Sequence, residues 1–416
     1  MAVSAVRHFA ALVSLMTVLD CASGTSTPTP ASPTPTSANS APAASPATPP
    51  GDVSVAPALA QPVRARLRLG TSGDYAPFST RDAAGTVRGF DAEIAGALAA
   101  DLGFELEWVS FRWPTLQAQL QNGDFDLAMS GVTWQTTRAV VGYLTRAVAR
   151  GGPCVLGDVH AARVAVNRGG VLEAWAHAHF AEREIVAVDA NQTLPELLAR
   201  GDAGAIVTDS FERRAFQRPG WGVYCEPALS RKVYWLAPGH ADLAGRVDAW
   251  LRVNTARIEN AQQHWFGERQ HLDALANLAD LLARRMAFMP LVAGAKAKLG
   301  LPVEDSAREK IVLDSAAASA RQVGLPEGAA RQFFELQIEL SKAVQRRSAE
   351  ATSLDLALQI RPALNELGER ILNAVVEARS AGQLANSALS DLELLSPWLN
   401  GSELQRLRDN LQALAR

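Results

Sequence analysis

Two adjacent glycines followed by a carboxylate, in the stretch VNRGGVLEAW, have the composition of a small-molecule site. Gly169 and Gly170 allow the backbone to approach a ligand closely. Glu173 follows at the expected start of a helix, where a site that only held an anion would not favour a carboxylate. Glu173 therefore contacts a ligand, caps a helix through the helix dipole, or delivers a proton.

A second candidate site consists of two cations on an apolar helical stripe. Arg285 follows Leu282 by three residues, and Lys296 lies about three turns further on, so both would share one face of a continuous helix. Burying unpaired cations is costly. Either the two side chains extend to solvent, or they face a bound anion. The neighbouring Arg284 and Lys298 have the pattern of ordinary surface charges.

The length and composition limit the classes of protein to consider. With 416 residues the chain is too long for one core, so two or three domains are expected. A net charge of −3, with 48% hydrophobic and 20% charged residues, is ordinary for a globular protein and indicates no nucleic-acid partner. The sequence indicates no cofactor and no metal ion, and it leaves a homo-oligomer open.

Residues 1–24 have the pattern of a secretory signal peptide: a weakly basic start, a short apolar run and small residues. VLDC partly resembles a lipobox, but Asp20 fits it poorly. Lipidation of Cys21, which would tether the chain to a membrane, and ordinary cleavage nearby both stay open. Residues 25–62, nearly all Ala, Ser, Thr and Pro, are expected to form an extended linker. This pattern predicts a periplasmic or other extracytoplasmic protein.

Export would place the two remaining cysteines in an oxidising compartment. Cys154 and Cys225 are then expected to form a disulfide, since that is the usual state of a cysteine pair there. The alternative is a pair of buried free thiols.

Residues 63–268 alternate strand-like and helical segments. ARLRLGT, the helix GFDAEIAGALAADLG closed by Gly103, ELEWVSF, a helix in WPTLQAQLQNGD and the strand FDLAMSG form one series. After Cys154 the pattern begins again with ARVAVNRGG. It predicts two α/β lobes, the second at about 152–235, with a cleft between them.

Residues 269–416 contain no strand-like run, and their apolar periodicity predicts an all-α domain. Pro290 should kink or break the first long helix. SDLELLSPWLNGSELQRLRDNLQALA predicts a single last helix. Because each half has its own apolar pattern, the halves are expected to remain active when separated near residues 267–271.

The motifs GTSGDYAPFS, GFDAEIAGALAADLG, GDFDLAMSGVTWQTTR and GDAGAIVTDSFE resemble those of extracytoplasmic amino-acid-binding proteins, which close two lobes around a ligand. The resemblance implies that Arg138 grips a substrate carboxylate, which suits the paired donors of a guanidinium. It also implies that Asp209 binds an α-ammonium group.

Within that family, GDYAPFS, RWPTLQ, MSGV, the glycine pair with Glu173, TDSFE and the placing of the two cysteines look like the cyclohexadienyl dehydratases. These enzymes convert prephenate to phenylpyruvate, and many also convert arogenate to phenylalanine. The resemblance implies that Glu173 is the general acid for the departing ring hydroxyl. It also implies that Lys232 is a second cation for a carboxylate. The other substrate-binding residues that it implies are Asp74, Tyr75, Trp113 and Thr133.

Four positions do not fit the dehydratase pattern or its substrate in a simple way. Val171 and Leu172 replace polar residues that are usual before the glutamate, which would either desolvate Glu173 or alter the substrate contacts. Trp134 stands where the subgroup often has an aliphatic residue. Asp209 has no ammonium group to bind in prephenate, so it either serves arogenate or is structural.

The stretch GLPVEDSAREK, taken with two upstream cations, resembles the all-helical chorismate mutases, especially their secreted subclass. The likeness covers about residues 270–380. Its polar positions Ser341 and Gln345 lie one helical turn apart, and Arg361 comes from later in the same chain. The site residues that the resemblance implies are Arg285, Lys296, Asp305, Arg308, Glu309, Ser341, Gln345 and Arg361.

The rearrangement of chorismate to prephenate is pericyclic, with no proton transfer and no covalent intermediate. The enzyme therefore helps by selecting the compact conformer and stabilising developing charge. Chorismate carries two carboxylates, which require cations. The resemblance implies catalytic roles for Arg308, Lys296 and Gln345, with the last two at the breaking ether oxygen. Because a glutamine amide is neutral at every pH, this site should not need acid.

The two resemblances name consecutive reactions. They predict a two-lobed α/β domain of the periplasmic-binding-protein type followed by an all-α chorismate mutase domain, in an exported bifunctional enzyme. The alternative is a non-enzymatic amino-acid-binding protein, for transport or sensing, fused to a helical module. A structural surface protein would require Arg285, Lys296 and Arg308 all to be surface charges.

Overall fold

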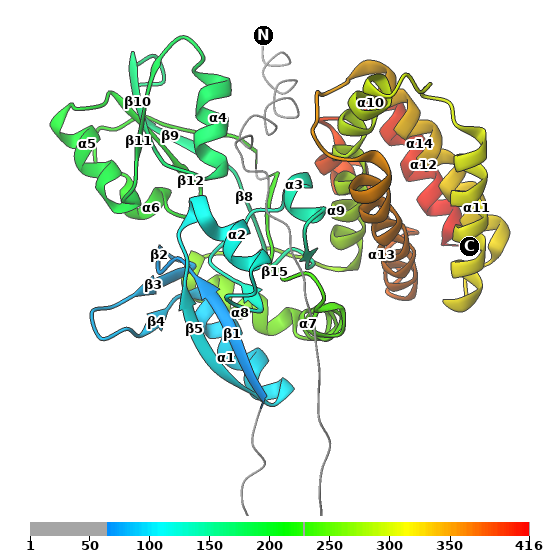
Figure 1. Ribbon diagram of the computed structural model, residues 1–416, viewed down its shortest axis with the longest axis horizontal. Coiled ribbons are helices and arrows are strands. Elements are labelled where there is room, and N and C mark those ends of the chain that lie inside the picture. Colours follow the sequence, from blue (N-terminus) through cyan, green and yellow to red (C-terminus); the bar gives the residue numbers. More distant parts are fainter. Residues whose placement is uncertain (1–64, 228, 416) are drawn as a thin grey trace, which may run out of the picture. The chain divides into compact units, whose positions relative to one another are not determined.

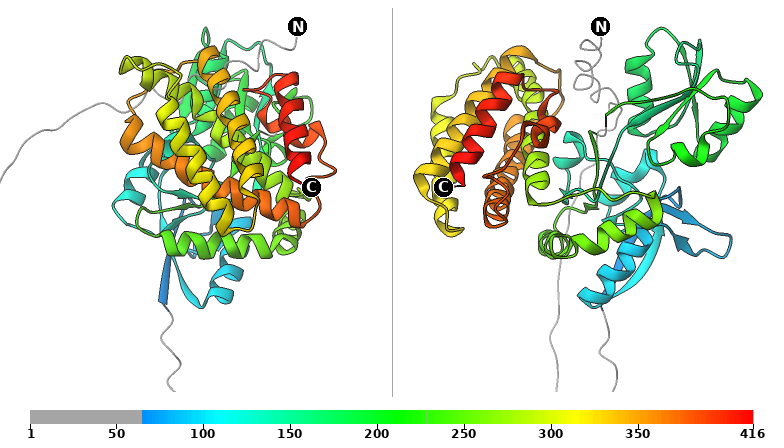
Figure 2. Two further views of the ribbon diagram at one scale, coloured as in Figure 1. Left: turned by 90° about the vertical axis from the view of Figure 1, so that its right-hand side faces the viewer. Right: turned by 180° about the vertical axis from the view of Figure 1, so that it is seen from behind.

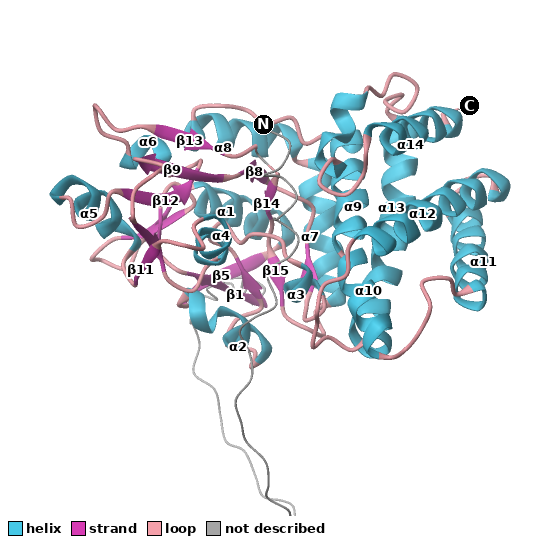
Figure 3. Cartoon of the chain, turned by 90° about the horizontal axis from the view of Figure 1, so that it is seen from above, coloured by secondary structure: helices cyan, strands magenta, loops and turns pink. Residues whose placement is uncertain are grey.

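The computed structural model describes residues 65–227 and 229–415. The predicted signal peptide, the linker at 25–62 and Cys21 lie outside the described residues. No helix in the described ranges is long and apolar enough to cross a membrane. Within the same ranges, strands occur only before helix α7 (Ala241–Val253), and only helices follow it (Figure 3).

The first lobe is built on a five-stranded sheet in the order β5-β1-β6-β15-β7. Its strands are β1 (Ala65–Thr71), β5 (Phe104–Ser110), β6 (Leu127–Ala128), β7 (Tyr143–Leu144) and β15 (Trp235–Leu236). β1 is parallel to β5 and β6, whereas β15 returns antiparallel from later in the chain. Helix α1 (Phe90–Leu102) lies beside β5 (Figure 1) and ends at Gly103 in the left-handed conformation, as predicted.

The predicted strand FDLAMSG is wrong in length, since β6 keeps only two residues. Ser130 and Gly131 both adopt positive φ, which ends the extended conformation. Gly131 is required at its position because a Cβ there would lie 2.6 Å from the Tyr75 ring. The turn places the backbone of residue 131 directly against that ring.

The second lobe has the sheet order β11-β10-β12-β9-β13. Its strands are β9 (Pro153–Gly157), β10 (Arg163–Asn167), β11 (Glu184–Val188), β12 (Ala205–Asp209) and β13 (Val223–Cys225). Helices α4 (Val171–His179) and α5 (Leu194–Arg200) pack against β10 and β12. Cys154 and Cys225 pair directly across β9 and β13 and are disulfide-bonded, which confirms that prediction.

Two antiparallel strands, β8 (Ala149–Gly151) and β14 (Ser230–Lys232), form the crossing between the lobes. A small sheet of β2 (Asp74–Tyr75), β3 (Ser79–Arg81) and β4 (Val87–Arg88) extends the first lobe. Helix α7 and helix α8 (Thr255–Phe266) pack against α1 and the first sheet in one apolar cluster.

The second half is entirely helical in its described residues, and Figure 2 shows its long helices beside one another. The helices are α9 (Ala274–Ala287), α10 (Met289–Lys298), α11 (Ser306–Gln322), α12 (Glu327–Arg347), α13 (Arg361–Ser380) and α14 (Gly401–Leu414), with the short turns η4 (Leu356–Ile360) and η5 (Leu389–Leu395). Pro290 lies in the first turn of α10, so the long first helix is broken there. A break was one of the two outcomes predicted for this proline.

The prediction of one last helix is wrong. The segment divides into η5 and α14, because Pro397 cannot continue a helix through its missing N–H. A new helix then begins at Asn400, whose side chain accepts a hydrogen bond from the Glu403 amide while the Glu403 carboxylate accepts one from the Asn400 amide.

Apolar residues of the two halves pack into one shared cluster. Buried residues of the first lobe, including Trp134 and Leu144, belong to the same cluster as Leu282 and Phe288 of the helical half. The Trp134 and Phe288 rings pack edge to face at 6.2 Å. Cutting the chain near residues 267–271 would therefore expose apolar surface on both halves.

Arg284 is fully buried at this junction, so its assignment as a surface charge is wrong, whereas Lys298 is exposed as predicted. The Arg284 guanidinium forms an ion pair of 2.7 Å with Asp280 and donates to the Thr145 carbonyl at 3.0 Å. Asp280 also pairs with Arg231 of the first half. Burial acts to raise the pKa of Asp280, but the two arginines outweigh it and hold that pKa below its usual range.

Removing the disulfide should destabilise the protein. It joins residues 71 positions apart, and closing a loop of that length restricts the unfolded chain by roughly 4 kcal/mol. We expect the paired change Cys154→Ala and Cys225→Ala to lower the free energy of unfolding in urea by about 2–5 kcal/mol. Two freely alkylated thiols in unreduced, unfolded wild-type protein would contradict the bond.

Arg284→Ala should destabilise the whole chain, because it breaks a buried ion pair by removing one partner. The usual cost of such a change is about 3–5 kcal/mol. Lys298→Ala, which removes an exposed cation from the next helix, is the matched control and should be silent. Equal urea midpoints for the two variants would show that the buried cluster does not hold the junction.

Candidate active sites

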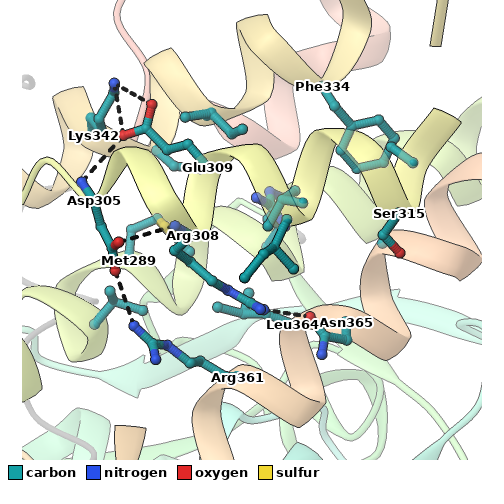
Figure 4. A pocket seen from close by; sticks show the side chains of 18 of the residues that line it. Met289, Asp305, Arg308, Glu309, Ser315, Phe334, Lys342, Arg361, Leu364 and Asn365 are labelled. Atoms are coloured by element: carbon teal, nitrogen blue, oxygen red, sulfur yellow. Dashed lines mark hydrogen bonds and ion pairs between the residues drawn. The ribbon is translucent and has the colours of Figure 1, made fainter. Parts of the chain in front are cut away.

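The helical half contains an open cavity of about 260 Å³, shown in part in Figure 4. All the residues that the sequence analysis assigned to the second site line it, although α9 and α10 are separate helices. They are Arg285 from α9, Lys296 from α10, Asp305 at the start of α11, Arg308 and Glu309 from α11, Ser341 and Gln345 from α12, and Arg361 from α13.

Two arginines of the cavity are held by side chains of neighbouring elements. Arg308 donates to the Asn365 amide oxygen at 2.7 Å, and Arg361 forms an ion pair of 3.2 Å with Asp305 (Figure 4). Asp305 also caps α11 by accepting from the Arg308 backbone amide at 3.0 Å. Asn365 was not predicted, and its position one helical turn after Arg361 is the sequence signal that marks it.

Two other cations of the cavity have no carboxylate within ion-pair distance among the described residues. Burial lowers the pKa of Arg285 to about 10, and Arg308 contributes in the same direction. Burial also lowers the pKa of Lys296, although Asp305 opposes that shift. The Lys296 ammonium donates instead to the Val303 carbonyl at 2.6 Å. An anion entering the cavity would supply the missing negative charge.

Uncharged polar atoms in the same cavity also lack partners. The Ser341 hydroxyl, the Gln345 amide oxygen and the Arg285 Nε are buried without a hydrogen bond to any described residue. Glu309 differs, because it forms an ion pair of 3.0 Å with Lys342 and its charge is already neutralised. Buried polar atoms without partners are costly, so the arrangement favours a polar ligand that satisfies them.

A smaller cleft, of about 60 Å³, is lined by residues of both α/β lobes. The structure brings together here most of the residues predicted for the first site. They are Asp74, Tyr75, Trp113, Thr133, Arg138, Asp209 and Lys232. Val171 and Leu172 also line the cleft, so the apolar pair is placed to contact a ligand.

Lys232 forms an ion pair and two hydrogen bonds inside this cleft. Its ammonium lies 2.8 Å from an Asp209 carboxylate oxygen, 3.0 Å from the Tyr75 hydroxyl and 3.1 Å from the Thr133 hydroxyl. Both charges are buried. The charge of Asp209 is therefore already compensated, which favours the structural role left open for it over that of a free receptor for an ammonium group.

Arg138 supplies a cation without a carboxylate partner within ion-pair distance in the described residues. It donates to the Thr133 carbonyl at 2.7 Å, and its guanidinium carbon lies 5.5 Å from the centre of the Trp235 ring. Burial lowers its pKa to about 10, so it is charged at neutral pH. Trp134 does not line the cleft and lies instead at the junction, between Arg231 and Arg284.

Glu173 lies on the first turn of α4 but is not among the residues that line the cleft. One of its carboxylate oxygens accepts a hydrogen bond from the Gly169 amide at 2.7 Å. The side chain is thus a first-turn carboxylate bound to the loop before α4, at the position near the helix N-terminus that the sequence left open as an alternative. The carboxylate nevertheless follows directly after two lining residues, Val171 and Leu172.

The two halves of the chain are similar to two different families of known proteins. The family of type II chorismate mutases matches residues 269–346. The chorismate mutase of Methanocaldococcus jannaschii is 31% identical over 85 residues, which cover 20% of this chain and 86% of that protein. The chain belongs to the chorismate mutase family. Its mutase domain carries the cavity of Figure 4.

The α/β half matches the bacterial extracellular solute-binding proteins of family 3 over residues 67–268. Cyclohexadienyl dehydratase of Pseudomonas aeruginosa is 29% identical over 223 residues, covering 49% of this chain and 83% of that protein. An ancestral amino-acid-binding protein described as a precursor of cyclohexadienyl dehydratase is 27% identical, covering 48% of this chain and 95% of that one, with a TM-score of 0.44. By sequence, the α/β half is therefore a homologue of cyclohexadienyl dehydratase.

Sequence reasoning missed several residues of the cleft and its surroundings. Asn191 and Glu212 line it directly. Asp91 holds the turn beside it by accepting from the Ser130 and Gly131 amides at 2.7 and 2.8 Å. Glu212 lies in the motif TDSFE, three residues after Asp209, so the one-turn spacing of two carboxylates was the available signal.

Lys296→Ala and Arg308→Ala should each reduce chorismate turnover, because each removes a cation that lines the mutase cavity. Losing one such donor typically costs 10²–10³-fold in kcat. Prephenate turnover by the same variants, measured as phenylpyruvate release, should be unchanged. Lys298→Ala is the control on α10, since its side chain is exposed. An equal loss of chorismate turnover in all three variants would contradict the site.

Proposed function

We propose that the chain is an exported enzyme that converts chorismate to prephenate in the helical cavity and prephenate to phenylpyruvate in the interlobe cleft. The cleft is also proposed to convert arogenate to phenylalanine. The observation that carries the proposal is the set of buried cations that have no carboxylate partner in the described part of the chain, in a domain of the chorismate mutase family.

In the mutase cavity, Arg285, Arg308 and Arg361 are proposed to bind the two carboxylates of chorismate and hold its compact conformer. The ether C–O bond breaks as a C–C bond forms, and negative charge develops on the ether oxygen. Lys296 and Gln345 are proposed to donate hydrogen bonds to that oxygen. No proton is transferred, so the amide of Gln345 serves over the whole pH range in which the protein is folded.

In the cleft, Arg138 is proposed to bind a prephenate carboxylate through charge-assisted hydrogen bonds. Glu173 delivers its proton to the ring hydroxyl, which leaves as water when the C–O bond breaks. The C–C bond to the ring carboxylate breaks in the same conversion, releases carbon dioxide and supplies the electron pair that makes the ring aromatic. Because the Glu173 carboxylate accepts a hydrogen bond from the Gly169 amide in the described conformation, we propose that ligand binding turns it from that amide into the cleft.

Export is supported by the pattern of residues 1–24, by the match to a family of extracellular proteins and by the disulfide. The location proposed is periplasmic or otherwise extracytoplasmic. Lipidation at Cys21 would add a membrane tether, and the mass of the mature N-terminal peptide distinguishes it from cleavage nearby.

Supplying the purified full-length chain with chorismate tests both activities together. Phenylpyruvate should accumulate, with prephenate as the transient intermediate. Prephenate that accumulates without phenylpyruvate would leave only the mutase function. Tight binding of an amino acid with no turnover of prephenate would replace the dehydratase function by that of a binding protein.

Glu173→Gln should abolish prephenate turnover and leave chorismate turnover intact. The amide keeps the shape of the side chain but cannot deliver a proton, and general acid catalysis typically contributes 10²–10⁴-fold. Phenylpyruvate release from prephenate is the measurement. Glu182→Gln, at an exposed position after the same helix, is the control. Wild-type turnover by Glu173→Gln would show that Glu173 is only a first-turn carboxylate of α4.

A further inference from the structure

Glu212 is a second carboxyl group of the cleft, and neither proposed reaction uses it. It is 3% exposed and lines the cleft next to Asp209 and Lys232. Its two oxygens face neutral donors: the Thr208 hydroxyl at 2.9 Å and the Asn191 side-chain amide. A buried carboxyl group with only neutral partners differs in kind from Asp209, which has a lysine within 2.8 Å.

The cleft contains one cation fewer than Glu212 would require. Lys232 is engaged by Asp209, and Glu212 forms no ion pair with any described residue. Arg213 and Arg214, which follow it in the chain, do not form an ion pair with it either. With Asp74 ionised as well, a charged Glu212 would place three carboxylates against Arg138 and Lys232 before any substrate entered. Repulsion between the neighbouring carboxylates therefore favours the neutral form of Glu212.

The groups that face Glu212 come from several elements. They are Asp209 and Thr208 on β12, Asn191 on the turn before α5, Lys232 on β14 and Tyr75 on β2. Burial raises the pKa of Glu212 to about 8, and the Asp209 charge adds to the effect, against the opposing hydrogen bonds and Lys232. Burial also keeps the pKa of Tyr75 well above its usual value, so the tyrosine is neutral throughout this range.

We infer that Glu212 works as a neutral carboxylic acid that admits dianionic substrates to the cleft, and that its ionisation excludes them. The inference rests on the proposed dehydratase function. Prephenate carries two carboxylates, and a third negative charge in the cleft lining would repel them at close range and low dielectric. Glu212 is thus a specificity-determining residue, and the proton donor of the reaction is a different group.

The sign of the pH dependence follows directly. Below about pH 8 Glu212 is neutral and the dianion binds. Above that pH the ionised fraction grows, and KM for prephenate should rise by about tenfold per pH unit, while kcat of the bound substrate stays nearly constant. Glu212→Gln mimics the neutral acid, so its KM should not rise with pH.

Steady-state turnover of prephenate between pH 6.5 and 9.5, on the full chain, is the test. Wild type and the control Glu182→Gln should show the rise in KM, and Glu212→Gln should not. The same rise in Glu212→Gln would overturn the inference. So would a loss of turnover in Glu212→Gln at every pH, because Glu212 would then be the proton donor.

Failure of the proposed function is distinguished by a binding measurement. If wild type does not turn over prephenate, calorimetric titration with prephenate itself over the same pH range replaces kinetics. Binding that weakens above about pH 8 in wild type and not in Glu212→Gln would support the role of Glu212 without the dehydratase reaction. Identical pH dependence in both proteins, or no binding by either, would overturn it.

Discussion

Burying a positive charge without a carboxylate beside it is costly, and the mutase cavity depends on that cost being met by a substrate. Arg285 and Lys296 are buried and have no ion-pair partner among the described residues, whereas Glu309 of the same cavity is neutralised by Lys342. The residues that line the cavity therefore leave a net positive charge uncompensated. A dianion with a compact shape meets that need, and the same cations then stabilise charge that develops during the rearrangement.

The interlobe cleft uses charge in the opposite way. Its lysine is already paired with Asp209, and only Arg138 is free of a carboxylate partner in the described residues. In such a cleft the protonation state of one further carboxyl group, Glu212, changes the balance between attraction and repulsion. The mutase cavity has no equivalent group in its proposed chemistry, because Gln345 does not titrate. The two sites should therefore differ in their response to pH.

The junction between the halves is tied to both sites along the chain. Arg284 is buried against Asp280, and its neighbour Arg285 lines the mutase cavity. Arg231 pairs with the same Asp280, and its neighbour Lys232 lines the cleft. Successive residues of a helix or a strand point in different directions, so one backbone segment serves a site and the junction at once. Loosening the junction would thus disturb the backbone of both sites.

Sequence alone determined the two classes of domain, the disulfide pair and the residues of the mutase cavity. The domain classes follow from the alternation of strands and helices and from the helical periodicity, and the disulfide from the two cysteines of an expected exported chain. Among the residues of the mutase cavity, spacing on an apolar stripe indicated Arg285 and Lys296, and the resemblance to chorismate mutases implied the others. Only the tertiary structure decided that Arg284 is buried, that Asp209 forms an ion pair with Lys232, and that Glu212 lines the cleft with no ion pair to any described residue. Each of those facts depends on which side chains from distant segments meet, and the free energy of a buried charge is set by those partners, which no local pattern contains.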